Sequence, residues 1–145
     1  MATAWLALGG NIGDPAAQLE EAVRRLDMLP YTRLTKRSSV SVTKPWGKTD
    51  QNDFHNMAIE VETDLSPLAL MEACLTVESD MGRTRIEVWG PRNIDIDIIA
   101  YERVEMISDT LTLPHPHAHE RDFVLDPLGE IAPEVVDWLK QVAAR

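Results

Sequence analysis

Two aspartates at alternate positions offer the clearest chemistry in this sequence. Residues 94–99 read Ile-Asp-Ile-Asp-Ile-Ile, and such alternation of apolar and acidic residues is typical of a half-buried β-strand. On that strand Asp95 and Asp97 share one face, roughly 6.5–7 Å apart at Cα. Carboxylate oxygens are hard ligands, and a pair that leaves room for water and phosphate is how Mg²⁺ is usually held beside a nucleotide. The alternative is an acidic, solvated strand face without a ligand.

Arginines near the acids favour the metal-binding interpretation. Arg83, Arg85 and Arg92 precede the two aspartates along the chain. Guanidinium groups suit phosphate oxygens, so one segment supplies groups for both the metal and the anion of a metal-chelated polyphosphate. Further along, His115 and Arg121 can also donate to an anion, and we interpret them as additional phosphate-binding residues.

Histidines at alternate positions raise the alternative of a transition-metal site. His115, His117 and His119 have this spacing, but two prolines and the lack of a nearby cysteine disfavour zinc. The single cysteine, Cys74, cannot form an internal disulfide.

The composition limits the class of protein. A chain of 145 residues with 44% hydrophobic and 26% charged residues is typical of a globular protein of one domain. Its formal net charge of -10 argues against general binding to nucleic acids or anionic membranes, because such binding needs a positive surface. We read no signal peptide and no apolar run long enough to span a bilayer, and we therefore expect a cytoplasmic protein.

A planar ligand could bind beside the strand expected at residues 54–63. Alternation places Phe54 and Asn56 on one face of this strand, next to a long loop at 43–53 that contains proline, glycine and polar residues. A phenyl ring can stack on a flat ligand, and an amide can both donate to the ligand's edge and accept from it. In the alternative interpretation Phe54 packs in a minor core and Asn56 caps the loop.

Hydrophobic periodicity predicts the elements that position these side chains. We expect strands at 4–8, 34–43, 54–63 and 94–99, a hairpin or edge segment at 101–107, and helices starting at 15, spanning 67–82 with Gly82 as C-cap, and spanning 133–145. Asp14 and Ser66, each followed by proline, are typical helix N-caps. Residues 9–13 contain glycines but lack the Lys-Ser/Thr pair of a phosphate-binding loop, so we interpret them as a tight turn.

One acid conflicts with the apolar stripe of helix 67–82. Leu68, Met71 and Leu75 form this stripe, and Glu78 continues it in the last turns of the helix. An acid there is unfavourable because of desolvation and because of the negative end of the helix dipole. We therefore expect a partner for Glu78, either a ligand hydroxyl or a following arginine, unless the side chain turns to solvent.

The expected element order indicates the fold class. Strand, helix, strand, strand, helix, strand is the order of a ferredoxin-like split βαβ unit of the α+β class. In this fold two helices pack on one face of an antiparallel sheet. The other face would be uncovered, and Phe54, Asn56, Asp95 and Asp97 would point from it into a space bounded by the long loops.

Together these motifs resemble those of the 6-hydroxymethyl-7,8-dihydropterin pyrophosphokinases, folate-pathway enzymes that transfer pyrophosphate from ATP to a pterin alcohol. The resemblance covers nearly the whole chain, and its most specific part runs from Pro91 through the two aspartates. The other matching segments include 6–14, 45–47, 54–56, 82–85, 114–116, 121–125 and 131–133. Departures include Gly10 in place of a usual serine, no basic residue at 86–88, and His117 in place of a frequent arginine.

The resemblance implies a role for each candidate residue. Two Mg²⁺ ions would be held by the two aspartates, and two phenylalanines would enclose the pterin ring. The residues that bind the pterin would be Thr43, Trp46, Phe54, Asn56 and Phe123. The residues that bind ATP would be Glu78, Arg83, Arg85, Arg92, His115 and Arg121. The metal ligands would be Asp95 and Asp97, and the catalytic residues would be Arg83, Arg92, Asp95 and Asp97. The pterin hydroxymethyl oxygen would attack the β-phosphorus of ATP in line, with AMP leaving.

We accordingly expect one pyrophosphokinase domain over residues 1–145, in a monomer whose partners are ATP and the pterin, without nucleic acid or membrane. Two other classes remain as alternatives. A ferredoxin-like sensor would bind a nucleotide or metal without turnover, but it leaves the phenylalanine pair and Asn56 unexplained. A metal-dependent phosphoesterase would use Asp95 and Asp97 to hydrolyse a nucleotide with no acceptor present.

Overall fold

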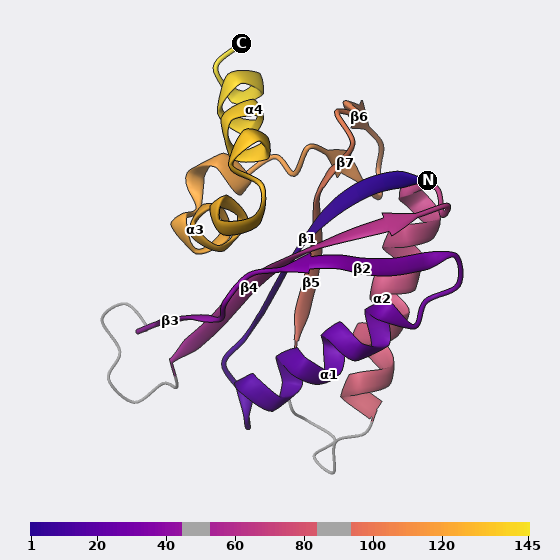
Figure 1. Cartoon of the computed structure of the whole chain (residues 1–145), viewed down its shortest axis with the longest axis vertical. Helices are drawn as coiled ribbons and strands as arrows, with labels where there is room; N and C mark the ends of the chain where they lie inside the picture. Colours follow the sequence, from indigo (N-terminus) through magenta and orange to yellow (C-terminus); the bar gives the residue numbers. More distant parts are fainter. Residues whose placement is uncertain (45–52, 84–93) are drawn as a thin grey trace.

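An antiparallel sheet forms the centre of the molecule, and helices cover parts of both of its faces (Figure 1). The computed structural model describes residues 1–44, 53–83 and 94–145. The strands are β1 Ala2–Gly10, β2 Thr32–Arg37, β3 Ser41–Thr43, β4 Phe54–Thr63, β5 Asp95–Tyr101, β6 Met106–Ile107 and β7 Thr112–Leu113. The helices are α1 Pro15–Asp27, α2 Pro67–Arg83, α3 Asp122–Ile131 and α4 Pro133–Ala143, and a 3-10 turn spans Ala118–Glu120.

The strand order of the main sheet is β2-β4-β1-β5, with β3 added to β4. Neighbouring strands in this order run antiparallel. This is the predicted ferredoxin-like α+β arrangement, in which β1 and β4 are central and β5 forms one edge. Among the residues that the structure describes, no helix has both the length and the apolar character needed to cross a membrane.

The two faces of the sheet belong to different cores. Side chains alternate along β1, so Leu6 and Leu8 pack with α1 and α2, whereas Trp5 packs with α3 and α4. Figure 1 shows this division, with α1 and α2 on one side of the sheet and α3 and α4 on the other. The expectation of an uncovered face is therefore wrong in part. Helices cover one end of it because apolar residues such as Ala58 and Ala100 lie there and are buried by them.

The strand predicted at 34–43 is in fact two strands. β2 ends at Arg37, and β3 begins at Ser41. At the break the Ser38 N–H donates to the Ala58 carbonyl oxygen (2.9 Å), and the Ala58 N–H donates to Ser38 Oγ (2.9 Å). The serine hydroxyl replaces a strand carbonyl as acceptor, so β2 can end without leaving the Ala58 amide unpaired. Alternation in the sequence does not reveal such a substitution.

The N-caps of the first two helices are confirmed. Asp14 Oδ1 accepts a hydrogen bond from the Ala17 N–H (3.2 Å) at the start of α1. Ser66 Oγ accepts one from the Ala69 N–H (3.2 Å) at the start of α2. Because a cap depends on a few consecutive residues, it can be recognised without tertiary information.

The buried stripe of α2 differs from the prediction. Leu68 and Leu75, which we expected inside, are 43% and 48% exposed. The α2 residues in the core are Leu70, Cys74, Val77 and Met81. The helix has apolar residues on more than one side, so two stripes with helical spacing exist, and packing against the sheet selects between them. The helix also continues through Gly82 to Arg83, so the expected C-cap at Gly82 is wrong.

The C-terminal region contains an expected and an unexpected helix. As its periodicity predicts, α4 buries Val135 and Leu139. The second helix, α3, was not expected from the sequence; it has Pro127 inside it and buries Val124 and Leu128 in the second core. The short strands β6 and β7 pair as a hairpin, of which only β6 lies within the segment expected at 101–107.

Candidate active site

A cleft of about 660 Å³ opens between the sheet and the start of α3, and we call it the aromatic cleft. The predicted site residues that line it are Thr43, Phe54, Asn56, Asp95, Asp97, Arg121 and Phe123. They come from β3, β4, β5 and the start of α3, which are widely separated along the chain. The acidic pair and the aromatic and amide group therefore share one cavity.

The rings of Phe54 and Phe123 lie on the wall of this cleft. The two residues are 39% and 44% exposed, whereas phenylalanine is usually buried. Phe54 begins β4, and Phe123 lies in the first turn of α3, where Arg121 Cζ lies 5.8 Å from its ring centroid. Phe54 thus does not pack in a minor core, the alternative that the sequence left open. The exposed rings offer stacking surfaces to a flat ligand.

The side chain of Asn56 is held where β1 carries no side chain. Asn56 is 9% exposed, and it lies opposite Gly9 in the β1–β4 ladder. A Cβ at Gly9 would come within 2.6 Å of Asn56 Oδ1, so only glycine leaves room for this amide. The tight turn expected from residue 9 onward is wrong for Gly9 and Gly10, because β1 continues through Gly10. Glycine inside a strand often marks such a close approach.

Asp95 and Asp97 project from one face of β5, as the alternation predicts. Both are exposed, and both line the aromatic cleft. They lie opposite Gly9 and Ala7, so the neighbouring strand carries no bulky side chain beside them. Two accessible carboxylates with open space beside them fit a hard, oxygen-coordinated cation such as Mg²⁺. Within the described ranges, no group of three or more His, Cys, Asp or Glu side chains is arranged to hold a metal.

A second cleft, of about 500 Å³, lies along the outer edge of β5, and we call it the edge cleft. Its apolar wall includes Met71 and Leu75 from α2 and Ile98 from β5, and residues 108–110 add polar groups. Asp97 lines both clefts. Asp97 therefore lies where the aromatic cleft and the edge cleft adjoin.

His115 lies on the wall of the edge cleft. Its backbone N–H donates to the Ile99 carbonyl oxygen (2.9 Å), and its Nδ1 accepts from the His117 N–H (3.2 Å). Burial lowers the pKa of His115 below its usual 6.5, although the charge of Asp97 acts in the opposite direction. A neutral ring whose Nδ1 accepts must carry its proton on Nε2. That N–H can donate to an anion, which is the role expected from the sequence.

Glu78 is turned toward the backbone of β5. It is 5% exposed, and its Oε2 accepts a hydrogen bond from the Ile96 N–H (2.6 Å). It does not turn to solvent, and its observed partner is a strand amide, which the sequence did not indicate.

Burial raises the pKa of Cys74 to about 12, and the charges of Glu78 and Asp97 act in the same direction. A thiol with such a pKa stays protonated at neutral pH and is not a nucleophile.

Part of the predicted site lies outside the described residues. This applies to Trp46, Arg85 and Arg92. Arg83 is described as the last residue of α2, and its side chain is not part of the description.

Several residues of the aromatic cleft were missed by the sequence analysis. Ala7 and Gly9 leave space beside the acids, and Asn11 and Lys44 add an amide and a positive charge to the wall. The only signals for the latter two are their positions, after the glycine pair and after Thr43. The significance of such neighbours appears only when β1 is paired with both β4 and β5.

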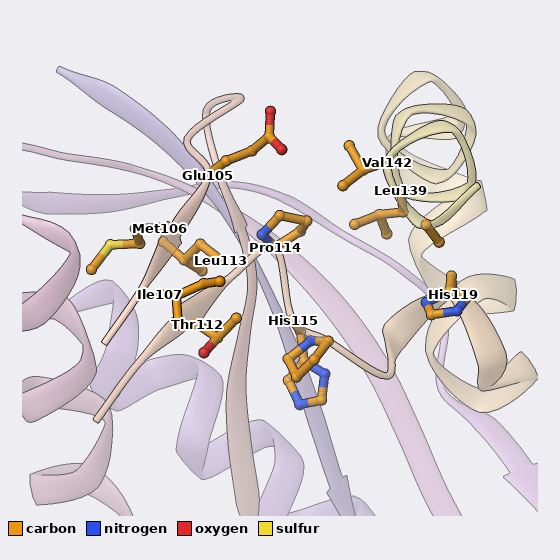
Figure 2. Close-up of a pocket in the computed structure, with 12 residues that line it drawn as sticks. Glu105, Met106, Ile107, Thr112, Leu113, Pro114, His115, His119, Leu139 and Val142 are labelled. Atoms are coloured by element: carbon orange, nitrogen blue, oxygen red, sulfur yellow. The ribbon is translucent and has the colours of Figure 1, made fainter. Parts of the chain in front are cut away.

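Another cavity, of about 460 Å³, lies between the β6–β7 hairpin and α4 (Figure 2). Its walls include apolar side chains of Leu113, Pro114, Leu139 and Val142. Figure 2 shows Leu139 and Val142 on the α4 side, facing Pro114. Of the predicted site residues that the structure describes, His115 alone reaches this cavity, so the acids and the phenylalanines meet elsewhere.

Known proteins resemble this chain over most of its length. The family model of 7,8-dihydro-6-hydroxymethylpterin-pyrophosphokinase (HPPK) matches residues 5–133. The 2-amino-4-hydroxy-6-hydroxymethyldihydropteridine pyrophosphokinase of Methylorubrum extorquens is 49% identical over 136 residues, covering 94% of this chain and 86% of that protein. The protein of the same name from Bacillus subtilis is 44% identical over 132 residues, covering 91% of this chain and 79% of that protein.

Solved structures share the fold. A crystal structure of Plasmodium falciparum HPPK-DHPS matches 92% of this chain with a TM-score of 0.71 at 16% identity. A crystal structure of HPPK-DHPS in complex with substrates matches 92% with a TM-score of 0.68 at 16% identity. The chain spans 40% of the length of each of these two solved chains. The family match over residues 5–133, with identities of 49% and 44% to relatives matched over 86% and 79% of their length, establishes that this chain belongs to the HPPK family.

Proposed function

We propose that this chain transfers pyrophosphate from ATP to the hydroxymethyl group of 6-hydroxymethyl-7,8-dihydropterin, giving the pterin diphosphate and AMP for folate biosynthesis. Membership of the HPPK family supports this assignment. The observation that carries it in this chain is that Asp97 lines both the aromatic cleft and the edge cleft. A triphosphate and an acceptor held in neighbouring clefts could meet at that residue.

The aromatic cleft is the proposed pterin site. Phe54 and Phe123 supply two ring faces, and Asn56 supplies a donor and an acceptor for the amide edge of the pterin. Backbone groups near Thr43 and Trp46 would complete the recognition of that edge. Because both rings are partly exposed, stacking a flat ring between them would remove apolar surface from water.

The edge cleft is the proposed nucleoside site. Leu75 and Ile98 offer an apolar surface for a base, and the Thr110 hydroxyl offers a hydrogen bond to a ribose. The triphosphate would extend from there toward Asp97. The proposed phosphate-binding residues are Arg83, Arg85, Arg92, His115 and Arg121.

Asp95 and Asp97 are proposed to hold two Mg²⁺ ions. Their exposure, their shared face and the small residues opposite them support this role. When bound, the metal would neutralise part of the charge of the ATP phosphates. We therefore expect activity to depend on Mg²⁺.

The transfer itself needs alignment more than acid-base chemistry. The pterin hydroxymethyl oxygen forms a bond to the β-phosphorus and loses its proton to water. The bond from that phosphorus to the oxygen bridging the α-phosphorus breaks, and AMP leaves with the bridging oxygen. The chain holds the two substrates in line, and the proposed role of Arg83 and Arg92 is to stabilise the charge that develops on the phosphates.

We further propose that residues 1–145 act as one domain, in a cytoplasmic monomer whose substrates are small molecules. Light scattering coupled to gel filtration tests the monomer directly. A mass near 16.3 kDa would support it, and a mass of about twice that value would contradict it.

The nucleotide product tests the proposed reaction. With Mg-ATP and the pterin alcohol, quenched reactions should contain AMP and pterin diphosphate in equal amounts. Release of ADP would contradict pyrophosphate transfer, hydrolysis without pterin would indicate a phosphoesterase, and binding without turnover would indicate a sensor. Asp97→Asn is the matched control for the proposed metal-binding role of Asp97, because it keeps the size of the side chain and removes its charge.

A further inference from the structure

The backbone amide between the two proposed metal-binding acids faces the outer edge of the sheet. Asp97, Ile96 and Asp95 pair with Ala7, Leu8 and Gly9 of β1, respectively. Alternate residues of an antiparallel strand direct their N–H groups toward the partner strand and away from it. The Ile96 N–H donates to Glu78, so it points away from β1, whereas the amides of the two aspartates point toward β1. In the described part of the sheet β5 is the edge strand, so no strand supplies an acceptor on that side.

Glu78 supplies that acceptor from a fixed position. Its Oε2 lies 2.6 Å from the Ile96 nitrogen, and the residue is 5% exposed. The adjacent turns of α2 are anchored in the core by Val77 and Met81. A buried carboxylate that accepts from an amide forms a short, charge-assisted hydrogen bond. Without it, the Ile96 N–H would be buried without an acceptor from a neighbouring strand, which is unfavourable.

We infer that Glu78 is a positioning residue of the transfer reaction, which sets the spacing of the Asp95 and Asp97 carboxylates by holding the peptide group between them. The inference rests on the proposed metal-binding role of the two aspartates. It differs from the nucleoside contact that the family resemblance implies for Glu78, because its carboxylate is buried against β5.

The hydrogen bond from the Ile96 N–H to Glu78 lies near the end of β5, where the position of the two aspartates depends on it. Asp95 is the first residue of β5, and strand ends are held by fewer hydrogen bonds than strand centres. The Ile96 side chain is buried in the core on the α2 face, and its amide is held by Glu78. These two constraints oppose rotation of the strand about its axis. Such a rotation would move both carboxylates, and an error of about 1 Å in positioning can lower a rate about 100-fold.

The negative charge of Glu78 is the competing explanation for any effect on the acids. Glu78 and Asp97 both act on the thiol of Cys74, so their charges are close enough to contribute to one local field. A field effect would be lost when the charge is removed, whereas a positioning effect would survive if an acceptor oxygen remained. Glu78→Gln keeps such an oxygen without the charge, and Glu78→Ala removes both.

The experiment measures kcat, KM for ATP and the half-saturating Mg²⁺ concentration in these two variants and in a core control. We expect Glu78→Ala to lower kcat at least about 10-fold and to raise the half-saturating Mg²⁺ concentration at least about 3-fold. Glu78→Gln should stay within about 3-fold of the original kcat. Val77→Ala, one position earlier on α2, should lower the melting temperature without changing the Mg²⁺ dependence.

Hydrogen exchange at the Ile96 amide gives a second readout that does not need turnover. The amide should stay protected in Glu78→Gln and should lose protection in Glu78→Ala. If Glu78→Ala does not fold, Glu78→Gln can still overturn the inference. A kcat reduced 10-fold or more in that variant, with Ile96 still protected, would mean that charge and not position matters, and would overturn the inference.

Asp95→Asn separates failure of this inference from failure of the metal proposal. If Asp95→Asn leaves the half-saturating Mg²⁺ concentration unchanged, the metal-binding role is wrong, and the inference falls with it. If Asp95→Asn raises that concentration but Glu78→Ala changes only the melting temperature, the metal-binding role stands and Glu78 is merely structural. Support requires that both substitutions change the Mg²⁺ dependence and that Glu78→Gln largely preserves it.

Discussion

Gly9 lies opposite Asn56 in the β1–β4 ladder, and a Cβ at Gly9 would come within 2.6 Å of Asn56 Oδ1. Asp95 lies opposite the same glycine on the other side of β1. Asn56, Gly9 and Asp95 therefore lie side by side across three neighbouring strands, and the residue in the middle has no side chain. The absence of a side chain in the middle of this row keeps the floor of the aromatic cleft open between the proposed pterin site and the proposed metal site.

Gly9→Ala should weaken pterin binding about 10-fold, because the added methyl group must displace the Asn56 side chain. Titration calorimetry with the pterin alcohol would measure the change. Gly129→Ala is the matched control, since a Cβ at Gly129 has no atom within 4 Å, and it should leave the affinity unchanged. Equal affinities of the Gly9→Ala variant and the original chain would show that Asn56 does not read the pterin.

Phe54→Ala and Phe123→Ala should each weaken pterin binding about 10- to 100-fold, because each removes one face of the stacking site. Their effect on the free energy of unfolding should be small, since the two residues are 39% and 44% exposed. Leu128→Ala provides the contrast, because Leu128 is 1% exposed and its truncation should cost about 2–5 kcal/mol. Denaturant unfolding and ligand titration on the same samples would separate the two effects. Unchanged pterin affinity in both phenylalanine variants would contradict the proposed sandwich.

His115 should make stability depend on pH on the acidic side of neutrality. Burial lowers its folded-state pKa below the usual 6.5, so the folded chain binds a proton less readily than the unfolded chain. The stability contributed by the neutral ring is complete above about pH 6.5 and is lost as the pH falls through the lowered pKa. His115→Gln should reduce this loss in urea unfolding measured at several pH values. An NMR titration of His115 with a midpoint at or above 6.5 would contradict the prediction.

Arg103→Ala should lower stability by about 1–2 kcal/mol without affecting kcat. Its guanidinium carbon lies 5.5 Å from the Trp5 ring centroid and 5.4 Å from that of Trp138, so one cation joins the sheet to α4. Arg33→Ala is a suitable control, because its ion pair with Glu62 is at the surface and should contribute less than about 1 kcal/mol. Thermal unfolding of both variants would test the difference. Equal melting temperatures would show that the two-sided ring contact adds nothing.

Patterns within a few neighbouring residues were enough to predict the fold class, two helix caps and the strand face of the two aspartates. Alternation over residues 94–99 correctly assigned Asp95 and Asp97 to one strand face, and both Asp14 and Ser66 cap the helices that follow them. The order of elements was enough to predict the ferredoxin-like fold class. These features depend on backbone geometry and on hydrogen bonds over three or four residues, so they can be read without knowing the partner elements. The resemblance to a family added roles for the site residues, and those roles remain proposals.

Tertiary structure decided the rest, because several patterns in the chain satisfy more than one packing arrangement. The apolar residues of α2 form two possible stripes, and only contact with the sheet buries Cys74 while leaving Leu75 exposed on the edge cleft. Likewise, Phe123 could be assigned to the same cleft as Phe54 only by resemblance, since no local pattern predicts that α3 lies beside β4. Close packing selects one arrangement because buried atoms must fill space without overlap, and that condition involves residues far apart in the chain.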